Sequence, residues 1–241
     1  MKVLIFLMFS VLLSLPPTLE NYNSLDLVLK NYVDSLGRVN YNGILKNPNN
    51  LNDYFKFIEK ISPKNRPTYF KTKNEKTAYW INAYNALIIK LMIENPNKNI
   101  LEISFGHAIW LTRFKVGEEM VSLYEIEHKI LKKLNDPRVH FAITCASKSC
   151  PPLGRRIFIG EKLDLQLDEK TTQFINDENH VKFDHLNKII YLNKIFKWYK
   201  KDFKNVKRFI IKYLKEDIDY SLIKNYKIRY LNYDWSSNNK N

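Results

Sequence analysis

The chain has 241 residues, of which 45% are hydrophobic and 14% aromatic, but it holds only 6 Gly and 9 Pro. This composition excludes a disordered or fibrous chain, and the length suits a single domain with one substantial core. The 39 Lys and Arg exceed the 25 Asp and Glu, for a formal charge of +14, which would favour an anionic envelope surface as a partner. No arginine and aromatic motif of nucleic-acid binding accompanies the charge, so nucleic acid is not an expected partner. The simplest interpretation is that lysines cover the outer faces of helices.

The first residues resemble a secretory leader. Lys2 precedes an apolar run from Val3 to Leu15, and Pro16-Pro17 interrupt it. This run is too short to span a bilayer, and no other stretch approaches the roughly 20 apolar residues that a spanning helix needs. Because no A-x-A cleavage site follows, an uncleaved N-terminal anchor stays open. We therefore expect a leader or anchor over 1–18, a single domain over 22–238, and an exported protein that is periplasmic, secreted or anchored.

The first part of this domain is predicted to be helical. Ser24 is suited to cap a helix that Gly37 ends, and an extended piece follows over 39–41. A second helix is expected over 51–61, followed by a proline-containing connection at 63–67.

Residues 75–94 are apolar around the whole circumference of a helix, which indicates a helix buried on all sides. Asn82 and Asn85 are the polar residues in its middle, and their spacing of three places them on one face. A buried amide left unpaired costs about 1–3 kcal/mol per group. We therefore expect both asparagines either to hold neighbouring backbone in a core network or to line a polar cavity.

A β-hairpin is predicted where residues 114–116 and 120–122 flank Gly117. Directly after it, Ser122 and Glu125 have the spacing of a capping box, which opens a helix. The sequence thus changes from strand to helix at this point.

On the helix expected to run to about Leu134, Glu127 falls inside the apolar stripe. We predict a buried carboxylate, which must be hydrogen-bonded, charge-paired or raised in pKa. His128 stands at the edge of the stripe, free to contact the partners of Glu127 or to face solvent.

The remaining elements give the fold class. Helices are expected over 161–177 and 195–214, and strands over 138–144, 189–192 and 227–235. Together they predict an α+β protein with helices packed on a small, mostly antiparallel sheet. The other histidines lack spaced partners and are interpreted as surface residues: His107, His180 and His185.

The densest group of chemistry-bearing residues spans 138–152. Alternation in the predicted strand places Arg138 and His140 on the face opposite the apolar residues. Cys145 then lies at the end of the strand, followed by Ser147, where exposed turns commonly present functional groups. Cys150 precedes a proline and is therefore extended.

Four interpretations of the two cysteines stay open. A Cys145–Cys150 disulfide is the simplest in an exported chain. Alternatively, Cys145 is a nucleophile activated by His140 or His128. A metal site could use His140 with both cysteines, although the spacing matches none of the usual motifs. Both residues could also be ordinary buried thiols.

Nucleotide cofactors are not expected, because the few glycines are not grouped into a phosphate-binding loop.

Four blocks in order resemble the domain-of-unknown-function family number five hundred and forty-seven: residues 79–86, 122–131, 136–142 and 145–153. The likeness extends outward to 37–41 and 233–235, and the leader without a leucine zipper is similar to bacterial exported members. The resemblance implies no established activity. It marks a set of signature positions: Asn82, Asn85, Glu127, His128, Arg138, His140, Cys145, Ser147 and Cys150.

The order of a buried helix followed by a histidine-bearing segment is loosely similar to cysteine-hydrolase and transglutaminase-like folds. Those folds place the nucleophilic cysteine on the helix, where this chain has residues 80–85. Direct transfer of their mechanism is thereby weakened.

The leading hypothesis is thiol-dependent hydrolysis or acyl transfer in the cell envelope, on a small substrate and without a cofactor or metal. Cys145 would be the nucleophile, His140 the base and Glu127 or Asn85 its orienter, with Arg138 near the substrate. The rival hypothesis is a non-catalytic binding or scaffold module with a Cys145–Cys150 disulfide and a basic docking face.

Overall fold

The computed structural model describes residues 19–240, so the predicted leader lies outside the described residues. The described part of the chain begins with helix α1 (Leu19–Tyr32), which packs against α3 (Asn49–Lys60). Ser24 lies inside α1 and does not start it, so that capping prediction is wrong. The extended piece predicted at 39–41 is present only in part. Val39 forms β-bridges with Val33 and Asn239, but helix α2 (Tyr41–Lys46) begins two residues later, where the Asn40 side chain accepts a hydrogen bond from the Gly43 amide.

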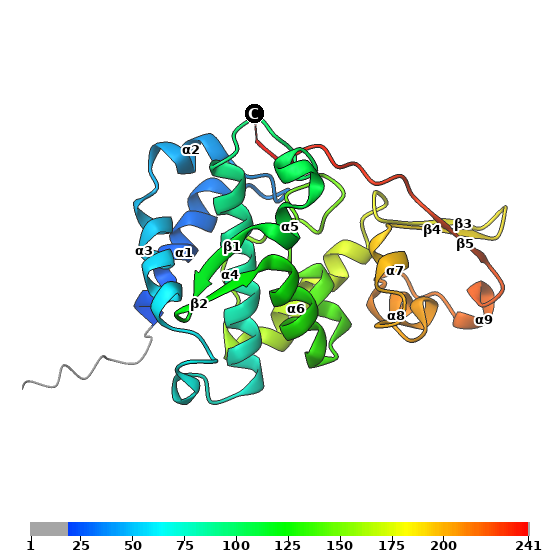
Figure 1. Ribbon diagram of the computed structural model, residues 1–241. Coiled ribbons are helices and arrows are strands. Elements are labelled where there is room, and N and C mark those ends of the chain that lie inside the picture. Colours follow the sequence, from blue (N-terminus) through cyan, green and yellow to red (C-terminus); the bar gives the residue numbers. More distant parts are fainter. Residues whose placement is uncertain (1–18, 241) are drawn as a thin grey trace, which may run out of the picture.

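Helix α4 (Lys73–Ile93) confirms the buried helix predicted over 75–94. Thr72 and Glu75 form a capping box at its start. Apart from Lys90, every residue from Thr77 to Met92 is buried, and in Figure 1 the helix runs through the middle of the larger part of the molecule. A short 3₁₀-helix, η1 (Pro67–Tyr69), precedes it.

After η2 (Ile103–Gly106) and α5 (Ala108–Leu111), the predicted hairpin is present as β1 (Arg113–Val116) and β2 (Glu119–Ser122). The strands are antiparallel, with Arg113 opposite Ser122. Gly117 has a φ of 59°, the left-handed value that the tight turn requires.

The capping box between Ser122 and Glu125 is confirmed, since each residue's side chain accepts a hydrogen bond from the other's amide. The helix that follows is not a regular α-helix. It is a π-helix, η3 (Glu125–Leu131), continued by the 3₁₀ turn η4 (Lys132–Leu134). Asn135, with a φ of 56°, ends it.

The strand predicted over 138–144 is wrong. This segment begins with a 3₁₀-helix, η5 (Pro137–Phe141), in which Val139, His140 and Phe141 are all buried. Pro137 stands at the first helical position and the Asp136 side chain accepts a hydrogen bond from the Arg138 amide at 3.0 Å. These two start signals override the alternating pattern.

The rest of the chain runs from the larger part of the molecule into the smaller part (Figure 1). It contains η6 (Gly160–Lys162), α6 (Leu163–Ile175) and the strands β3 (Val181–Asp184), β4 (Ile189–Leu192) and β5 (Lys227–Tyr230). Strand β4 pairs antiparallel with β3 and parallel with β5. With its helices and two small sheets, the protein has the predicted single-domain α+β arrangement.

The continuous helix expected over 195–214 is wrong. The structure has α7 (Ile195–Trp198) and α8 (Val206–Tyr213), with α9 (Tyr220–Ile223) after them. The helical segment is interrupted because Asn205 caps the start of α8. Its side chain accepts a hydrogen bond from the Arg208 amide at 3.0 Å. The last predicted strand is also shorter than expected, because β5 ends at Tyr230.

Two hydrophobic clusters meet along α6 and η5. Leu163 and Leu167 of α6 belong to the first cluster, which gathers residues from 25 to 167, whereas Phe174 of α6 and Phe141 of η5 belong to the second. Trp235 packs against both clusters. The seam between them is therefore where segments distant in sequence come together.

The C-terminal tail crosses this seam. From β5 it runs back over the molecule toward α2 (Figure 1). Val39 forms a parallel bridge with Asn239, and Ser147 forms an antiparallel bridge with Ser237. The tail thus joins the N-terminal helices to the segment that holds the cysteines. Across residues 19–240, no helix is both long enough and apolar enough to cross a membrane.

Candidate functional site

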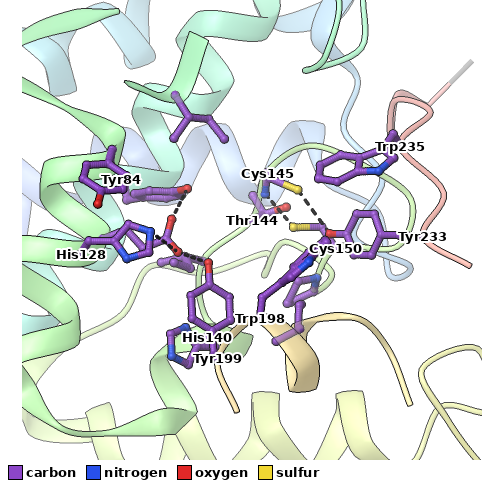
Figure 2. Close-up of a pocket in the computed structure, with 16 residues that line it drawn as sticks. Tyr84, His128, His140, Thr144, Cys145, Cys150, Trp198, Tyr199, Tyr233 and Trp235 are labelled. Atoms are coloured by element: carbon purple, nitrogen blue, oxygen red, sulfur yellow. Dashed lines mark hydrogen bonds and ion pairs between the residues drawn. The ribbon is translucent and has the colours of Figure 1, made fainter. Parts of the chain in front are cut away.

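A cavity of about 360 Å³ lies at the seam between the clusters (Figure 2). Five of the predicted site residues line it: Glu127, His128, His140, Cys145 and Cys150. Much of the remaining lining is aromatic: Tyr84, Tyr124, Trp198, Tyr199, Tyr233 and Trp235. Tyr84 and His128 lie on one side of the cavity, and Tyr233 and Trp235 on the opposite side.

Cys145 is a free, half-buried thiol in the cavity wall. Its sulfur lies 3.2 Å from Ser147 Oγ and 3.5 Å from the Tyr233 hydroxyl. Hydrogen bonds from Cys150, Ser147 and Tyr233 outweigh burial and lower the pKa of Cys145 to about 7. A substantial fraction of this thiol is therefore the reactive thiolate at neutral pH.

Cys150 is the buried neighbour of this thiol. Its sulfur accepts a hydrogen bond from the Cys145 amide at 2.8 Å, and both residues are free cysteines, so the predicted disulfide is not formed in this structure. Burial, with the adjacent Cys145, raises the pKa of Cys150 well above its ordinary value. The two thiols are thus differentiated, with Cys145 the reactive one.

The buried asparagines both hold backbone, as the core-network interpretation predicts. Asn85 donates to the Ala142 carbonyl at 2.9 Å and accepts from the Thr144 amide at 3.0 Å. Asn82 makes the same pair of bonds with the carbonyl and amide of Phe158, at 2.8 and 2.9 Å. Asn85 therefore fixes the backbone that leads into Cys145, whereas Asn82 fixes a segment away from the cavity.

The other side of the Cys145 segment is held by the C-terminal tail. The Asn238 amide donates to the Ala146 carbonyl at 3.0 Å, and the Lys148 amide donates to the Ser236 carbonyl at 2.9 Å. Ala146 itself has a φ of 62°, a left-handed conformation that reverses the chain after Cys145. The turn is thereby fixed between α4 and the tail.

Glu127 confirms the predicted buried carboxylate, with a residue exposure of 7%. It accepts hydrogen bonds from the hydroxyl of Tyr84 at 3.1 Å and from that of Tyr199. His128 Nε2 lies farther away, 3.7 Å from Glu127 Oε1. Burial and the negative charge of Glu127 both raise the pKa of Tyr84 and of Tyr199, so both phenols remain neutral donors.

His140 is paired with Asp202, which is not one of the predicted site residues. Its Nε2 lies 2.9 Å from Asp202 Oδ2, and its ring stacks on Tyr199 with centroids 3.8 Å apart. His140 is 6% exposed, and its Nδ1 is buried without a hydrogen-bond partner in the described structure. Burial lowers the pKa of this histidine, which is therefore neutral at pH 7.

The contacts among Glu127, His140 and Cys145 differ from those in the thiol-hydrolase hypothesis. Glu127 contacts the two tyrosines, and Asp202 takes the position beside His140 that Glu127 was expected to occupy. Within residues 19–240, the side chains hydrogen-bonded to the Cys145 sulfur are Ser147, Tyr233 and Cys150, and not His140.

Arg138 is engaged outside the cavity. Its guanidinium forms ion pairs with Asp136 at 2.6 Å, Asp164 at 2.7 Å and Asp168 at 2.9 Å. These pairs tie η5 to α6, and Arg138 is not among the described residues that line the cavity. Its position supports a structural role in placing η5.

Residues 68–175 match the family model described as Protein of unknown function, DUF547. The match confirms the resemblance over this segment, which contains all nine signature positions. No curated protein and no solved structure matches the chain. The likeness to cysteine-hydrolase folds stays a prediction.

Several residues of the site lie outside the segment that matches DUF547. Trp198, Tyr199, Tyr233 and Trp235 line the cavity, and Asp202 pairs with His140 behind it. Asp202 carried a signal in the sequence, because it is the single acidic residue between Lys194 and Lys215. The aromatic residues gave no such signal, because their spacing fits the core-facing stripe of an ordinary helix equally well.

The structure also bears on the metal interpretation and on the three histidines predicted to lie at the surface. No group of three or more His, Cys, Asp or Glu able to hold a metal ion occurs within residues 19–240, so the metal interpretation gains no support. The surface interpretation of His180 is wrong: its ring is buried and stacks on Phe174 with centroids 4.0 Å apart. His107 and His185 are exposed, as predicted.

Proposed function

We propose that this chain is a thiol-dependent hydrolase or acyltransferase with Cys145 as its nucleophile. The carrying observation is a free thiol in the wall of a cavity, with a pKa lowered to about 7 by hydrogen bonds. Roughly half of such a group is thiolate at pH 7, without a base to deprotonate it first. We also propose an envelope location, which rests on the apolar run from Val3 to Leu15.

In the proposed reaction, the Cys145 thiolate attacks the carbonyl carbon of an ester, thioester or amide. A sulfur–carbon bond forms, the bond from that carbon to the leaving group breaks, and the leaving group takes up a proton. Water or a second nucleophile then attacks the acyl-enzyme. The sulfur–carbon bond breaks, the thiolate is restored and the attacking group loses a proton.

His140 is the proposed proton carrier, with Asp202 and not Glu127 as its orienter. The 2.9 Å contact to Asp202 holds one ring nitrogen and leaves Nδ1 available. Nδ1 is buried, so contact with the substrate requires the surrounding side chains to move. Catalytic hydrogen bonds often tighten only when substrate is bound, which is consistent with this arrangement.

The test uses the purified reduced protein and nitrophenyl butyrate. We expect nitrophenol release with a transient butyryl group on the peptide that contains Cys145, located by mass spectrometry after acid quenching. In Cys145→Ala, the rate of nitrophenol release should fall at least 100-fold once the background reaction of surface lysines is subtracted. Its circular dichroism and unfolding midpoint should stay near those of the wild type.

Cys150→Ala is the matched control, because it removes the neighbouring thiol and retains the proposed nucleophile. It should still form the acyl-enzyme, with its pH profile moved upward because the Cys150 hydrogen bond no longer lowers the pKa of Cys145. A folded Cys145→Ala protein that hydrolyses the ester as fast as the wild type would refute the proposed function.

A further inference from the structure

We infer that the cavity binds a ligand carrying an alkylammonium group, with the cation held against Glu127. This inference names a substrate class for the proposed function, an acyl compound with a positively charged amine, and rests on that function for the chemistry. The binding itself is carried by the charge and the aromatic lining of the cavity.

The described lining of the cavity carries a negatively charged side chain without a basic one. Among the described residues that line it, Glu127 is the single acidic side chain and none is Lys or Arg. Burial lowers the pKa of His140, so that ring contributes no positive charge at neutral pH. Within this lining, the other group able to carry a positive charge is His128, whose Nε2 is 3.7 Å from Glu127 Oε1 and beyond hydrogen-bond length.

The hydrogen bonds that Glu127 receives do not balance its charge. Both come from neutral tyrosine hydroxyls, Tyr84 and Tyr199. A buried carboxylate is costly unless an opposite charge accompanies its hydrogen bonds. A ligand ammonium beside Glu127 would supply an opposite charge, and the burial of Glu127 would strengthen the attraction.

Aromatic rings surround the same space. Tyr84, Tyr124 and Tyr199 line it together with Glu127. Trp198, Tyr233 and Trp235 form a cluster on the Cys145 side, with ring centroids 4.5 to 5.7 Å apart. Aromatic faces attract cations, more strongly when water is excluded, and recognition of ammonium ligands by such rings is a common use of this interaction.

Because the whole chain is positively charged, any preference for a cation must come from groups inside the cavity. A formal charge of +14 repels a small cation at long range. Salt screens this repulsion more strongly than the attraction within a buried site. Added salt should therefore leave ammonium binding unchanged or strengthen it slightly, whereas an anion attracted to surface lysines would be lost.

Three probes of equal chain length separate charge from apolar contact: hexylammonium, hexanol and hexanoate. Titration of the reduced wild-type protein at pH 7 by calorimetry should give at least tenfold tighter binding of hexylammonium than of hexanol, with hexanoate the weakest. Equal affinity for hexylammonium and hexanol, or tighter binding of hexanoate, would overturn the inference without any variant.

Glu127→Gln removes the charge and nearly conserves the shape. We expect its affinity for hexylammonium to fall to the level of hexanol, whose own affinity should change less than threefold. The control is Glu119→Gln, on an exposed strand position away from the cavity, which should keep the wild-type preference. A folded Glu127→Gln protein that still prefers hexylammonium tenfold would contradict the assignment.

These outcomes are separable from those of the proposed function. Ammonium preference in a protein that never forms an acyl-enzyme would support the inference and refute the thiol chemistry. Acyl-enzyme formation at Cys145 with no preference for hexylammonium would support the chemistry and refute the inference.

Discussion

The Tyr233 hydroxyl lies 3.5 Å from the Cys145 sulfur, although 88 positions separate the two residues in the chain. The same hydroxyl is 3.3 Å from Ser147 Oγ. Tyr233 lies in the C-terminal tail, beyond the segment that matches DUF547. The chemical environment of the candidate nucleophile is therefore completed by a part of the chain that the family match does not cover.

Tyr233→Phe should raise the pKa of Cys145 above its value of about 7, because the phenol hydroxyl is one of the groups that lower it. The ring would keep its contacts with Trp198 and Trp235. The measurement is the iodoacetamide alkylation rate against pH, followed by intact mass. Tyr230→Phe, on β5, is the control, and an unchanged midpoint in Tyr233→Phe would contradict the role assigned to the hydroxyl.

Asn85→Ala and Asn82→Ala form a matched pair, because each removes a side chain that bonds one backbone amide and one carbonyl. Each group left unpaired costs about 1–3 kcal/mol, so both variants should unfold at lower urea concentration. Asn85→Ala should in addition change the alkylation rate of Cys145, because it frees the backbone that precedes this cysteine. Asn82→Ala should leave that rate unchanged. Equal effects on Cys145 would show that Asn85 is only a stability residue.

Local chemistry explains which elements could be predicted from sequence. The buried helix α4 follows from apolar residues on all its faces, and the Ser122–Glu125 capping box follows from spacing alone. The alternation over 138–144 is typical of a strand, but both alternating faces are buried at Val139, His140 and Phe141 of η5. The Asp136-Pro137 start signal outweighs the alternation.

The candidate site was predictable only within its own segment. Cys145, His140 and Glu127 do line one cavity. Tyr84 of α4 bonds Glu127, and Asn85 of α4 bonds the backbone before Cys145. Which carboxylate pairs with His140 depends on how the second cluster folds against the first, and Asp202 lies 62 positions away in sequence. No periodicity or spacing encodes such a distant contact, and the same holds for Tyr233 beside Cys145.

Gly37→Ala should destabilise the protein by about 1 kcal/mol or more, because Gly37 has a φ of 75° and an added Cβ would lie 2.6 Å from the Cβ of Pro152. Pro152 closely follows Cys150, so the turn at Gly37 also restrains the cysteine segment. Urea unfolding measures the loss. Gly154→Ala is the control, with its nearest neighbour 3.6 Å away, and it should be close to neutral. Equal stability of the two variants would contradict the steric argument.

Stability should fall as the pH is lowered from 7 to 5. Burial lowers the pKa of His140 and of His180 in the folded state. The unfolded chain, with histidine near pKa 6.5, then binds more protons, so this stabilisation is complete above about pH 6.5 and is lost as pH falls through the folded values. Urea midpoints at several pH values should decline across this window, less steeply in His180→Gln than in the exposed-site control His185→Gln. A flat profile for the wild type would show that neither buried ring is held neutral.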